Sequence, residues 1–233
     1  RAKTLSYFGG NKLKAFLMAA GKGTRLYPFT DNNPKPLIRV GGISLIERNI
    51  LKLKENNVSE VIINVHHFGE KIINFLGDGS SYGLKISYSL EKELLGTGGG
   101  ICNSIHHFQD PFIALSSDTW TDFDLKGLSL EKGKLAHMIL VPNPEQNFAG
   151  DVALVNGSID PQRGNDKYTF SGISILSPEL FNESRVTKAE LWDDFLKPAA
   201  AKGLVSGELY EGPFENLNTM EDVERLDASL GEE

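Results

Sequence analysis

The apolar residues of this chain follow two alternating patterns. Short apolar runs predict buried strands, because a strand covered on both faces carries apolar side chains at nearly every position. Five such runs lie in the first part of the chain, at residues 14–20, 60–65, 84–89, 112–115 and 135–141. Between the first two, Ile43, Ile46, Ile50 and Leu53 recur every three or four residues and predict an amphipathic helix, and residues 69–76 predict a shorter one. Strands that alternate with helices indicate an α/β fold with a mainly parallel sheet.

The pattern changes after Pro142, where strands follow one another with less helix between them. Residues 151–155, 168–176 and 204–210 are interpreted as strands, so a mixed sheet is expected in this half. A helix is predicted over residues 191–196 and is expected to end before Pro198. Asn218 and Glu221 resemble a capping box that opens a C-terminal helix. Because no linker or repeat interrupts the chain, residues 14–233 are predicted to form a single domain, with residues 1–13 as a tail of uncertain origin.

Composition excludes several classes of protein. Of 233 residues 40% are hydrophobic and the net charge is -7, so the chain is apolar enough to fold. No apolar run reaches the roughly 20 residues of a membrane-spanning helix, so none is expected. The excess of acidic residues, 31 against 24 basic, argues against a nucleic-acid binder. A single cysteine, Cys102, excludes an internal disulfide and fits a reducing compartment.

The first predicted strand runs into a glycine-rich loop, residues 19–28, with the sequence AAGKGTRLYP. Its backbone N–H groups are little shielded by side chains, so the loop could wrap a polyphosphate. It is neither a Walker A loop nor a dinucleotide-binding fingerprint. Residues 21–39 hold four basic residues (Lys22, Arg25, Lys35 and Arg39) against one acid, Asp31. A basic segment in an acidic protein favours a specific anionic ligand, and a solvated turn with incidental charges is the alternative.

Two further features carry candidate chemistry. Lys35 stands between Pro34 and Pro36, which restrict its backbone and fix the direction of its ammonium group, although a rigid loop with an exposed lysine is the alternative. A second glycine cluster, residues 95–101, follows the third strand and opens a predicted helix. Its glycines could allow a flat ligand to approach the backbone, or they could allow close packing of the helix on the sheet. Both interpretations stay open.

Asp118 lies just beyond the carboxyl end of the strand at residues 112–115, where ligands bind in open α/β sheets. A single carboxylate there suits Mg²⁺, which often takes only one or two ligands from protein. Asp122 and Asp124 are interpreted as caps of a helix that follows Asp124. Four of the five histidines form neighbouring pairs, at residues 66–67 and 106–107, whose side chains diverge, so a histidine metal site is not expected.

Together these motifs resemble the signature of the sugar-1-phosphate nucleotidyltransferases. The pattern GxGTRLxPxTxxxPKPL covers residues 21–37, and further matches lie at residues 94–101, 141–144, 150–154 and 168–172. Within that family the chain resembles the N-acetylmuramate α-1-phosphate uridylyltransferases of bacterial cell-wall recycling, over roughly residues 14–230. The resemblance implies a cytoplasmic enzyme with a Rossmann-like nucleotidyltransferase fold, in which helices flank a mainly parallel mixed central sheet.

The resemblance also implies a reaction and a set of site residues. A sugar 1-phosphate, here N-acetylmuramic acid α-1-phosphate, would attack the α-phosphorus of UTP, releasing pyrophosphate and forming a UDP-sugar. Arg25 would hold the triphosphate, Lys35 would bridge the two reacting phosphates, and Asp118 with Asn216 would bind Mg²⁺. The nucleotide would lie against Ala19, Ala20, Gly21, Lys22, Gly23, Thr24, Gly96 and Thr97, and the sugar against Phe148, Gly150, Asp151 and Gly172.

The chain departs from the family pattern before its last helix. Where the family usually shows Trp-x-Asp-x-Gly-Thr, residues 214–219 are FENLNT, so Asn216 replaces the aspartate and Asn218 replaces the glycine. An amide oxygen can coordinate Mg²⁺, but the loss of one negative charge should weaken the site. Two alternatives therefore stay open: an enzyme like the mannose-1-phosphate guanylyltransferases, and a degenerate module that binds a sugar nucleotide without turning it over.

Overall fold

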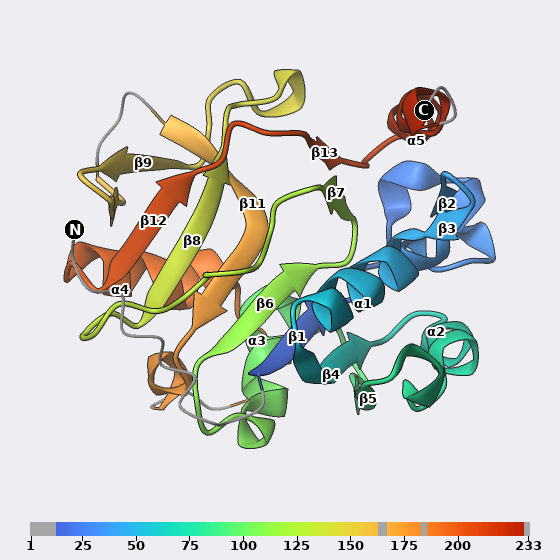
Figure 1. Ribbon diagram of the computed structural model, residues 1–233, viewed down its shortest axis with the longest axis horizontal. Coiled ribbons are helices and arrows are strands. Elements are labelled where there is room, and N and C mark those ends of the chain that lie inside the picture. The colour runs from blue at the N-terminus through green and yellow to red at the C-terminus, as the bar shows by residue number, and fades with distance from the viewer. Residues whose placement is uncertain (1–12, 163–166, 183–185, 231–233) are drawn as a thin grey trace.

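A mixed β-sheet forms the centre of the molecule (Figure 1). The computed structural model describes residues 13–162, 167–182 and 186–230. Among these residues nine strands make up the sheet, in the spatial order β5 (Lys85–Leu90), β4 (Val58–Val65), β1 (Leu13–Met18), β6 (Phe112–Ser116), β11 (Lys167–Leu176), β8 (Ala136–Val141), β12 (Val205–Leu209), β10 (Ser158–Asp160) and β9 (Val152–Val155). The predicted strands of both halves of the chain thus belong to one sheet.

The strand directions divide the sheet into two parts. β5, β4, β1 and β6 are parallel to one another. β11 runs antiparallel to both β6 and β8, and β12 is parallel to β8. The predicted α/β fold with a mixed central sheet is confirmed, with parallel pairing throughout the first part. Because β5, β4, β1 and β6 share a direction, their carboxyl ends lie at the same edge of the sheet, and the loops that follow them are neighbours there.

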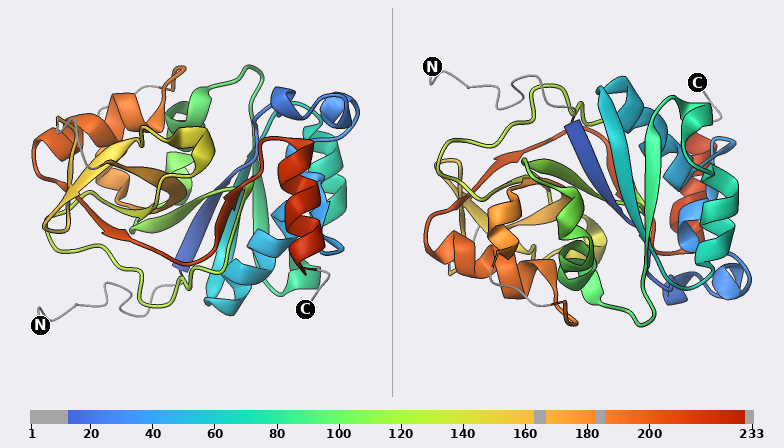
Figure 2. Two further views of the ribbon diagram at one scale, coloured as in Figure 1. Left: turned by 90° about the horizontal axis from the view of Figure 1, so that it is seen from above. Right: turned by 90° about the horizontal axis from the view of Figure 1, so that it is seen from below.

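Helices cover both faces of the sheet (Figure 2). α1 (Leu45–Glu55) and α2 (Gly69–Leu76) bury their apolar sides in one core, and α3 (Gly96–Ser104) and α4 (Lys197–Ala201) bury theirs in a second core. Strand β1 contributes to both, because its side chains alternate between the two faces: Phe16 enters one core while Ala15 and Leu17 enter the other. All three are fully buried, and a side chain the size of Phe16 contributes roughly 1.5–3 kcal/mol by leaving water.

The C-terminal segment packs beside the first part of the chain through a third apolar cluster. Strand β13 (Phe214–Asn216) pairs antiparallel with β7 (Thr119–Thr121), and α5 (Met220–Leu230) then inserts Val223 and Leu226 between residues of the segment after the glycine-rich loop. That segment includes the short hairpin of β2 (Arg39–Val40) and β3 (Ile43–Ser44). The backbone N–H of Gly41 donates to Asp227 Oδ1 at 2.7 Å. Helix α5 is thereby fixed against residues 38–45.

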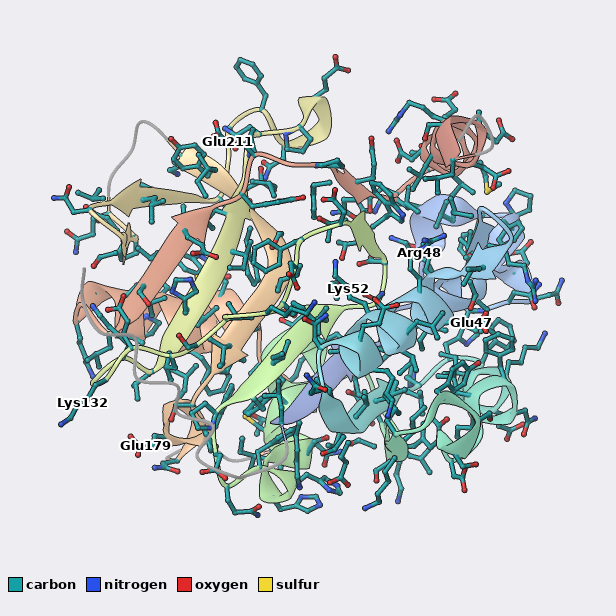
Figure 3. The ribbon with its side chains drawn as sticks, in the orientation of Figure 1. Glu47, Arg48, Lys52, Lys132, Glu179 and Glu211 are labelled. Atoms are coloured by element: carbon teal, nitrogen blue, oxygen red, sulfur yellow. The ribbon has the colours of Figure 1, made fainter. Side chains whose placement is uncertain are left out.

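Lys52 of α1 makes a further link to β7 (Figure 3). Its Nζ donates a hydrogen bond to the carbonyl oxygen of Thr121 at 2.8 Å. Burial lowers the pKa of Lys52 to about 8, although the nearby carboxylates of Asp122 and Asp124 act in the opposite direction. The segment that follows Asp118 is therefore held on α1 by a partly desolvated amine.

Three local predictions are wrong. No helix follows Asp124; its Oδ1 instead accepts a hydrogen bond from the N–H of Lys126 at 2.9 Å, which closes a turn. Pro198 does not end the helix at Leu191–Leu196, which is a π-helix and continues directly into α4. The turn that precedes Pro198 is π-helical, with the N–H of Lys197 donating to the carbonyl oxygen of Trp192, and this local widening lets the helix continue past a residue that has no N–H. Ile43 belongs to β3 rather than to α1.

Strand β1 begins at Leu13, which is the first described residue. The rest of the predicted tail, residues 1–12, lies outside the described residues. No helix in the described ranges is long and apolar enough to cross a membrane.

Candidate active site

A cavity of about 700 Å³ opens at the sheet edge where β1, β4 and β6 end. This is the edge at which open α/β sheets bind ligands. Predicted site residues that line it are Ala19, Ala20, Gly21, Gly23, Thr24, Arg25, Lys35, Gly96, Thr97, Asp118, Gly172 and Asn216. The other four predicted residues, Lys22, Phe148, Gly150 and Asp151, are not among its lining residues.

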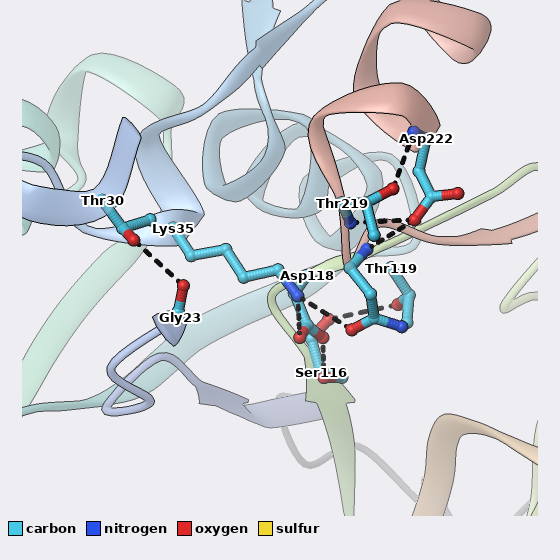
Figure 4. A network of polar contacts seen from close by, with 9 residues as sticks. Gly23, Thr30, Lys35, Ser116, Asp118, Thr119, Thr219 and Asp222 are labelled. Atoms are coloured by element: carbon cyan, nitrogen blue, oxygen red, sulfur yellow. Dashed lines mark hydrogen bonds and ion pairs between the residues drawn. The ribbon is translucent and has the colours of Figure 1, made fainter. Parts of the chain in front are cut away.

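The glycine-rich loop forms one wall and is shaped by two different glycines. Gly21 has open space where a Cβ would be, so its backbone is accessible to a ligand. Gly23 has a φ of +64°, and a Cβ on it would lie 2.9 Å from Cβ of Lys35. The carbonyl oxygen of Gly23 accepts a hydrogen bond from Thr30 Oγ1 at 3.0 Å (Figure 4). The exposed guanidinium of Arg25 has no hydrogen bond or ion pair within the described part of the chain, so it is available to an anion.

Lys35 is buried, with 6% of its surface exposed, and it points toward Asp118 (Figure 4). Its Nζ donates to Asp118 Oδ2 at 2.7 Å and lies 3.5 Å from the side-chain oxygen of Asn218. The short helix Lys35–Leu37 holds its backbone, since the N–H of Ile38 donates to the carbonyl oxygen of Lys35. A buried ammonium requires such a partner, because an unpaired charge at this depth would be costly. The prediction of an aimed Lys35 side chain agrees with this geometry.

Asp118 lies two residues after the end of β6, and both of its carboxylate oxygens accept hydrogen bonds. Oδ2 accepts from Lys35, and Oδ1 accepts from the hydroxyl of Ser116. Burial acts to raise the pKa of Asp118, but the Lys35 ammonium and the Ser116 hydroxyl outweigh it and hold the pKa below the ordinary value. The side chain still exposes 31% of its surface toward the cavity. Asp118 is therefore a carboxylate at neutral pH that a ligand can reach.

Asn216 and Asn218 reach the same wall from the far end of the sequence. Asn216 of β13 is opposite Thr119 of β7, and both asparagines line the cavity while Leu217, between them, is fully buried. The backbone N–H of Leu217 donates to the carbonyl oxygen of Asp118 at 3.3 Å. Strand pairing thus brings two amide side chains to the cavity wall that carries Asp118.

The turn into α5 fixes this arrangement. Asp222 Oδ2 accepts from the N–H groups of Asn218 and Thr219 at 3.0 and 2.9 Å, and Thr219 Oγ1 accepts from the N–H of Asp222. The capping box is therefore formed by Thr219 and Asp222, one residue later than the predicted pair, Asn218 and Glu221. Burial would raise the pKa of Asp222, but these hydrogen bonds keep it below the ordinary value. The carboxylate of Asp222 therefore stays charged, and a negative charge at this position stabilises the N-terminus of α5.

The second glycine cluster is explained by packing. Helix α3 lies so close to residues 187–195 that a Cβ on Gly96, Gly98 or Gly99 would approach that segment to between 2.4 and 2.6 Å. The N–H groups of Gly98 and Gly99 both donate to the carbonyl oxygen of Ala189 at 3.0 Å. Of the two interpretations left open, the close-packing one accounts for these glycines, and the cavity reaches only the start of the helix.

Residues 188–192 form a wall that sequence reasoning missed. Glu190 lines the cavity together with Lys188 and Trp192, and its Oε2 accepts from Thr97 Oγ1 at 2.9 Å. Thr97 Oγ1 in turn accepts from the N–H of Leu191 at 2.8 Å. No motif marks this segment, because it meets α3 only through the tertiary fold.

On the expected sugar side, the structure separates the predicted residues. Gly172 lines the cavity with a φ of +80°, and a Cβ on it would lie 2.8 Å from Cβ of Ser116. Asp151 instead accepts from the N–H of Phe170 at 2.8 Å, which anchors the start of β11. Gly150 packs against Lys167, and Phe148 is 88% exposed. Gly150, Asp151 and Phe148 therefore support or flank the wall rather than line it.

Comparisons with known proteins agree on one family. Residues 14–145 match the family model described as nucleotidyl transferase. The chain is 34% identical to the N-acetylmuramate alpha-1-phosphate uridylyltransferase of Neisseria meningitidis serogroup B, an alignment that covers 94% of this chain and 99% of the relative. It is 26% identical to the D-glycero-alpha-D-manno-heptose 1-phosphate guanylyltransferase of Campylobacter jejuni, covering 90% and 96% of the two chains.

A solved structure shows the same fold. The crystal structure of HddC from Yersinia pseudotuberculosis, complexed with GMP-PN, superposes with a TM-score of 0.76 at 21% identity and covers 93% of this chain and 99% of that one. The Rossmann-like nucleotidyltransferase fold that the sequence motifs implied is thereby confirmed.

Proposed function

The chain belongs to the nucleotidyl transferase family, and we propose that it transfers UMP from UTP to N-acetylmuramic acid α-1-phosphate, releasing pyrophosphate and forming a UDP-sugar. The observation that carries this choice of substrates is the alignment with the Neisseria uridylyltransferase, which spans 99% of that relative. The single cysteine and the nature of the substrates favour a cytoplasmic location as part of the same proposal.

The cavity supplies what this chemistry needs. A sugar phosphate is already an anionic nucleophile near neutral pH, so no strong general base is required, and catalysis depends on positioning and on neutralising charge. The accessible backbone at Gly21 and the exposed guanidinium of Arg25 would hold the triphosphate. One phosphate oxygen of the sugar phosphate forms a bond to the α-phosphorus, and the bond from that phosphorus to the pyrophosphate oxygen breaks. Arg25 would stabilise the departing pyrophosphate.

Lys35 would act between the two reacting phosphates. Its ammonium is fixed at the cavity wall by Asp118, so it needs no large reorganisation to meet negative charge. The ion pair with Asp118 compensates the lysine charge in the absence of substrate. When phosphates enter, Lys35 can exchange its carboxylate partner for phosphate oxygens while it stays buried. This preorganisation is the geometric support for Lys35 as a catalytic residue.

Mg²⁺ fits the donors at this wall. Asp118 offers a carboxylate and Asn216 an amide oxygen, which are hard oxygen ligands, on paired segments next to each other. We propose these two residues as its protein ligands, with Asp118 supplying the only charge. When bound, the ion would neutralise charge on the phosphates. Ser116 and the helix-capping Asp222 hold the two ligand segments in place.

A guanylyltransferase is the second candidate, because the Campylobacter relative aligns over nearly its whole length. The degenerate binding module is less well supported, since Arg25, Lys35 and Asp118 all reach one cavity. To test the proposal, pyrophosphate release is measured for each of the four NTPs with N-acetylmuramic acid, N-acetylglucosamine, glucose and mannose 1-phosphates. Release with UTP and the first sugar is expected; release only with GTP would support the second candidate, and no release with any pair would support the binding module.

A further inference from the structure

Two buried polar side chains, Asn64 and Glu91, connect the loops on either side of the cavity. Asn64 lies in β4 and Glu91 directly follows β5, and they are 4% and 7% exposed. The N–H of Ala19 donates to Asn64 Oδ1 at 2.8 Å, and Asn64 Nδ2 donates to Glu91 Oε1 at 2.8 Å. The N–H of Leu95 donates to Glu91 Oε2 at 3.0 Å. A relay of three hydrogen bonds therefore runs from the loop after β1 to the start of α3.

The chemistry of the two ends dictates the residue types between them. Both ends are peptide N–H groups, which can only donate. An asparagine offers one acceptor and one donor, so it can follow Ala19 only with its oxygen toward Ala19 and its amide nitrogen toward residue 91. Residue 91 must then accept at both ends, which a carboxylate does and an amide cannot. With glutamine at position 91, every orientation of the two side chains would leave one N–H facing another N–H.

Both relay side chains line the cavity, and on the side toward α3 they are tightly packed. A Cβ on Gly100 would lie 2.7 Å from both Asn64 Nδ2 and Glu91 Oε1. The backbone of Glu91 is also fixed, since its N–H donates to the carbonyl oxygen of Val65 at 2.9 Å and its carbonyl oxygen lies 2.9 Å from His66 Nδ1. A mismatched side chain therefore cannot move toward α3, and a shift toward the cavity would break the hydrogen bond to Ala19 or to Leu95.

We propose that Glu91, acting through Asn64, sets the separation between the loop at Ala19 and the loop at Leu95, and is thereby a positioning residue for nucleotide binding. This inference rests on the proposed function, in which the nucleotide contacts both loops. In that proposal the reacting phosphate groups would lie elsewhere, at Lys35 and Asp118. A broken relay should therefore weaken nucleotide binding while leaving the chemical step of the bound complex largely intact.

The test uses the full chain with Glu91→Gln and the double variant Asn64→Asp with Glu91→Gln. The single variant places two donors face to face, and its Kd and KM for UTP with Mg²⁺ should rise about tenfold, with kcat within about twofold of the wild type. The double variant moves the carboxylate to position 64, which then accepts from Ala19 and from the new glutamine. The glutamine oxygen accepts from Leu95. All three hydrogen bonds are restored, so UTP affinity should return to within about threefold of the wild type.

Two further variants separate positioning from stability. Glu60→Gln changes a carboxylate near the opposite end of β4, where it pairs with Lys14 and Lys85, and it should leave the Kd for UTP unchanged. Gly100→Ala should raise the Kd without altering either relay side chain, and it serves if Glu91→Gln does not fold. Normal UTP affinity in folded Glu91→Gln, or a folded double variant no better than the single one, would overturn the inference. A wild-type chain that binds neither UTP nor any other NTP would instead refute the proposed function.

Discussion

Replacing Lys35 with methionine would remove the ammonium group that lies 2.7 Å from Asp118 while keeping most of the volume of a side chain that is 6% exposed. The wall of the cavity should therefore stay packed. What is lost is the positive charge proposed to lie between the two reacting phosphates. We expect kcat to fall about a hundredfold, which corresponds to about 2.7 kcal/mol of transition-state stabilisation, with a much smaller change in NTP affinity.

The same variant should change the pH dependence. In the wild type the Lys35 ammonium is the largest of the influences that oppose burial and keep the pKa of Asp118 low. Without it, burial is opposed only by the hydrogen bonds from Ser116 and from the backbone N–H of Asp118, so the pKa of Asp118 should rise. Because the carboxylate is the proposed metal ligand, the acid limb of the pH–rate profile should move to higher pH in Lys35→Met.

Initial rates of pyrophosphate release, measured from pH 5 to 9 alongside calorimetric NTP binding, would test both effects. Lys85→Met is a matched control, since Lys85 is a paired lysine of β5 outside the cavity lining. Near-normal turnover in a folded Lys35→Met protein would refute the role assigned to Lys35. A large rate loss with an unmoved acid limb would show that Lys35 does not control the protonation of Asp118.

Three further predictions concern the metal site, the loop and α1. Asp118→Asn should nearly abolish turnover, whereas Asn216→Asp should preserve or raise it and should lower the Mg²⁺ concentration that the enzyme requires. Both effects can be measured by titrating the reaction rate with Mg²⁺. Activity that persists after Mg²⁺ is chelated would contradict the metal assignment. Gly23→Ala should lower the free energy of unfolding in urea by about 1–2 kcal/mol and reduce turnover, because the φ of Gly23 is +64° and the new methyl group would contact Lys35. Unchanged stability and turnover would contradict this prediction. The pKa of Lys52 is about 8 in the folded chain and 10.5 ordinarily. Between these two pH values Lys52 is protonated mainly in the unfolded chain, so the free energy of unfolding increases as pH rises through this range. In Lys52→Met this increase should be absent when the free energy of unfolding is measured as a function of pH. The same pH dependence in the variant and the wild type would refute the reasoning.

Much of the fold could be predicted from the sequence because it depends on local periodicity. The apolar runs of β1, β4 and β6 and the three- and four-residue spacing in α1 need no information from elsewhere in the chain. The glycine-rich loop and the Pro-Lys-Pro segment could also be recognised, since special backbone conformations require glycine or proline at particular positions. These features predicted an anion site at one edge of a mixed sheet.

The tertiary structure decided how the site is assembled. Lys35 pairs with Asp118 across 83 residues, and β13 joins β7 from the other end of the chain. The second glycine cluster has two equally good explanations in the sequence, and the packing of residues 187–195 against α3 favours one of them. No sequence pattern marks Glu91, because its role depends on hydrogen-bond donors in two loops that only the sheet brings together. Sequence patterns record what each residue needs from its own backbone and from its burial, whereas a partner many residues away is specified only when the packed strands fix the distance between them.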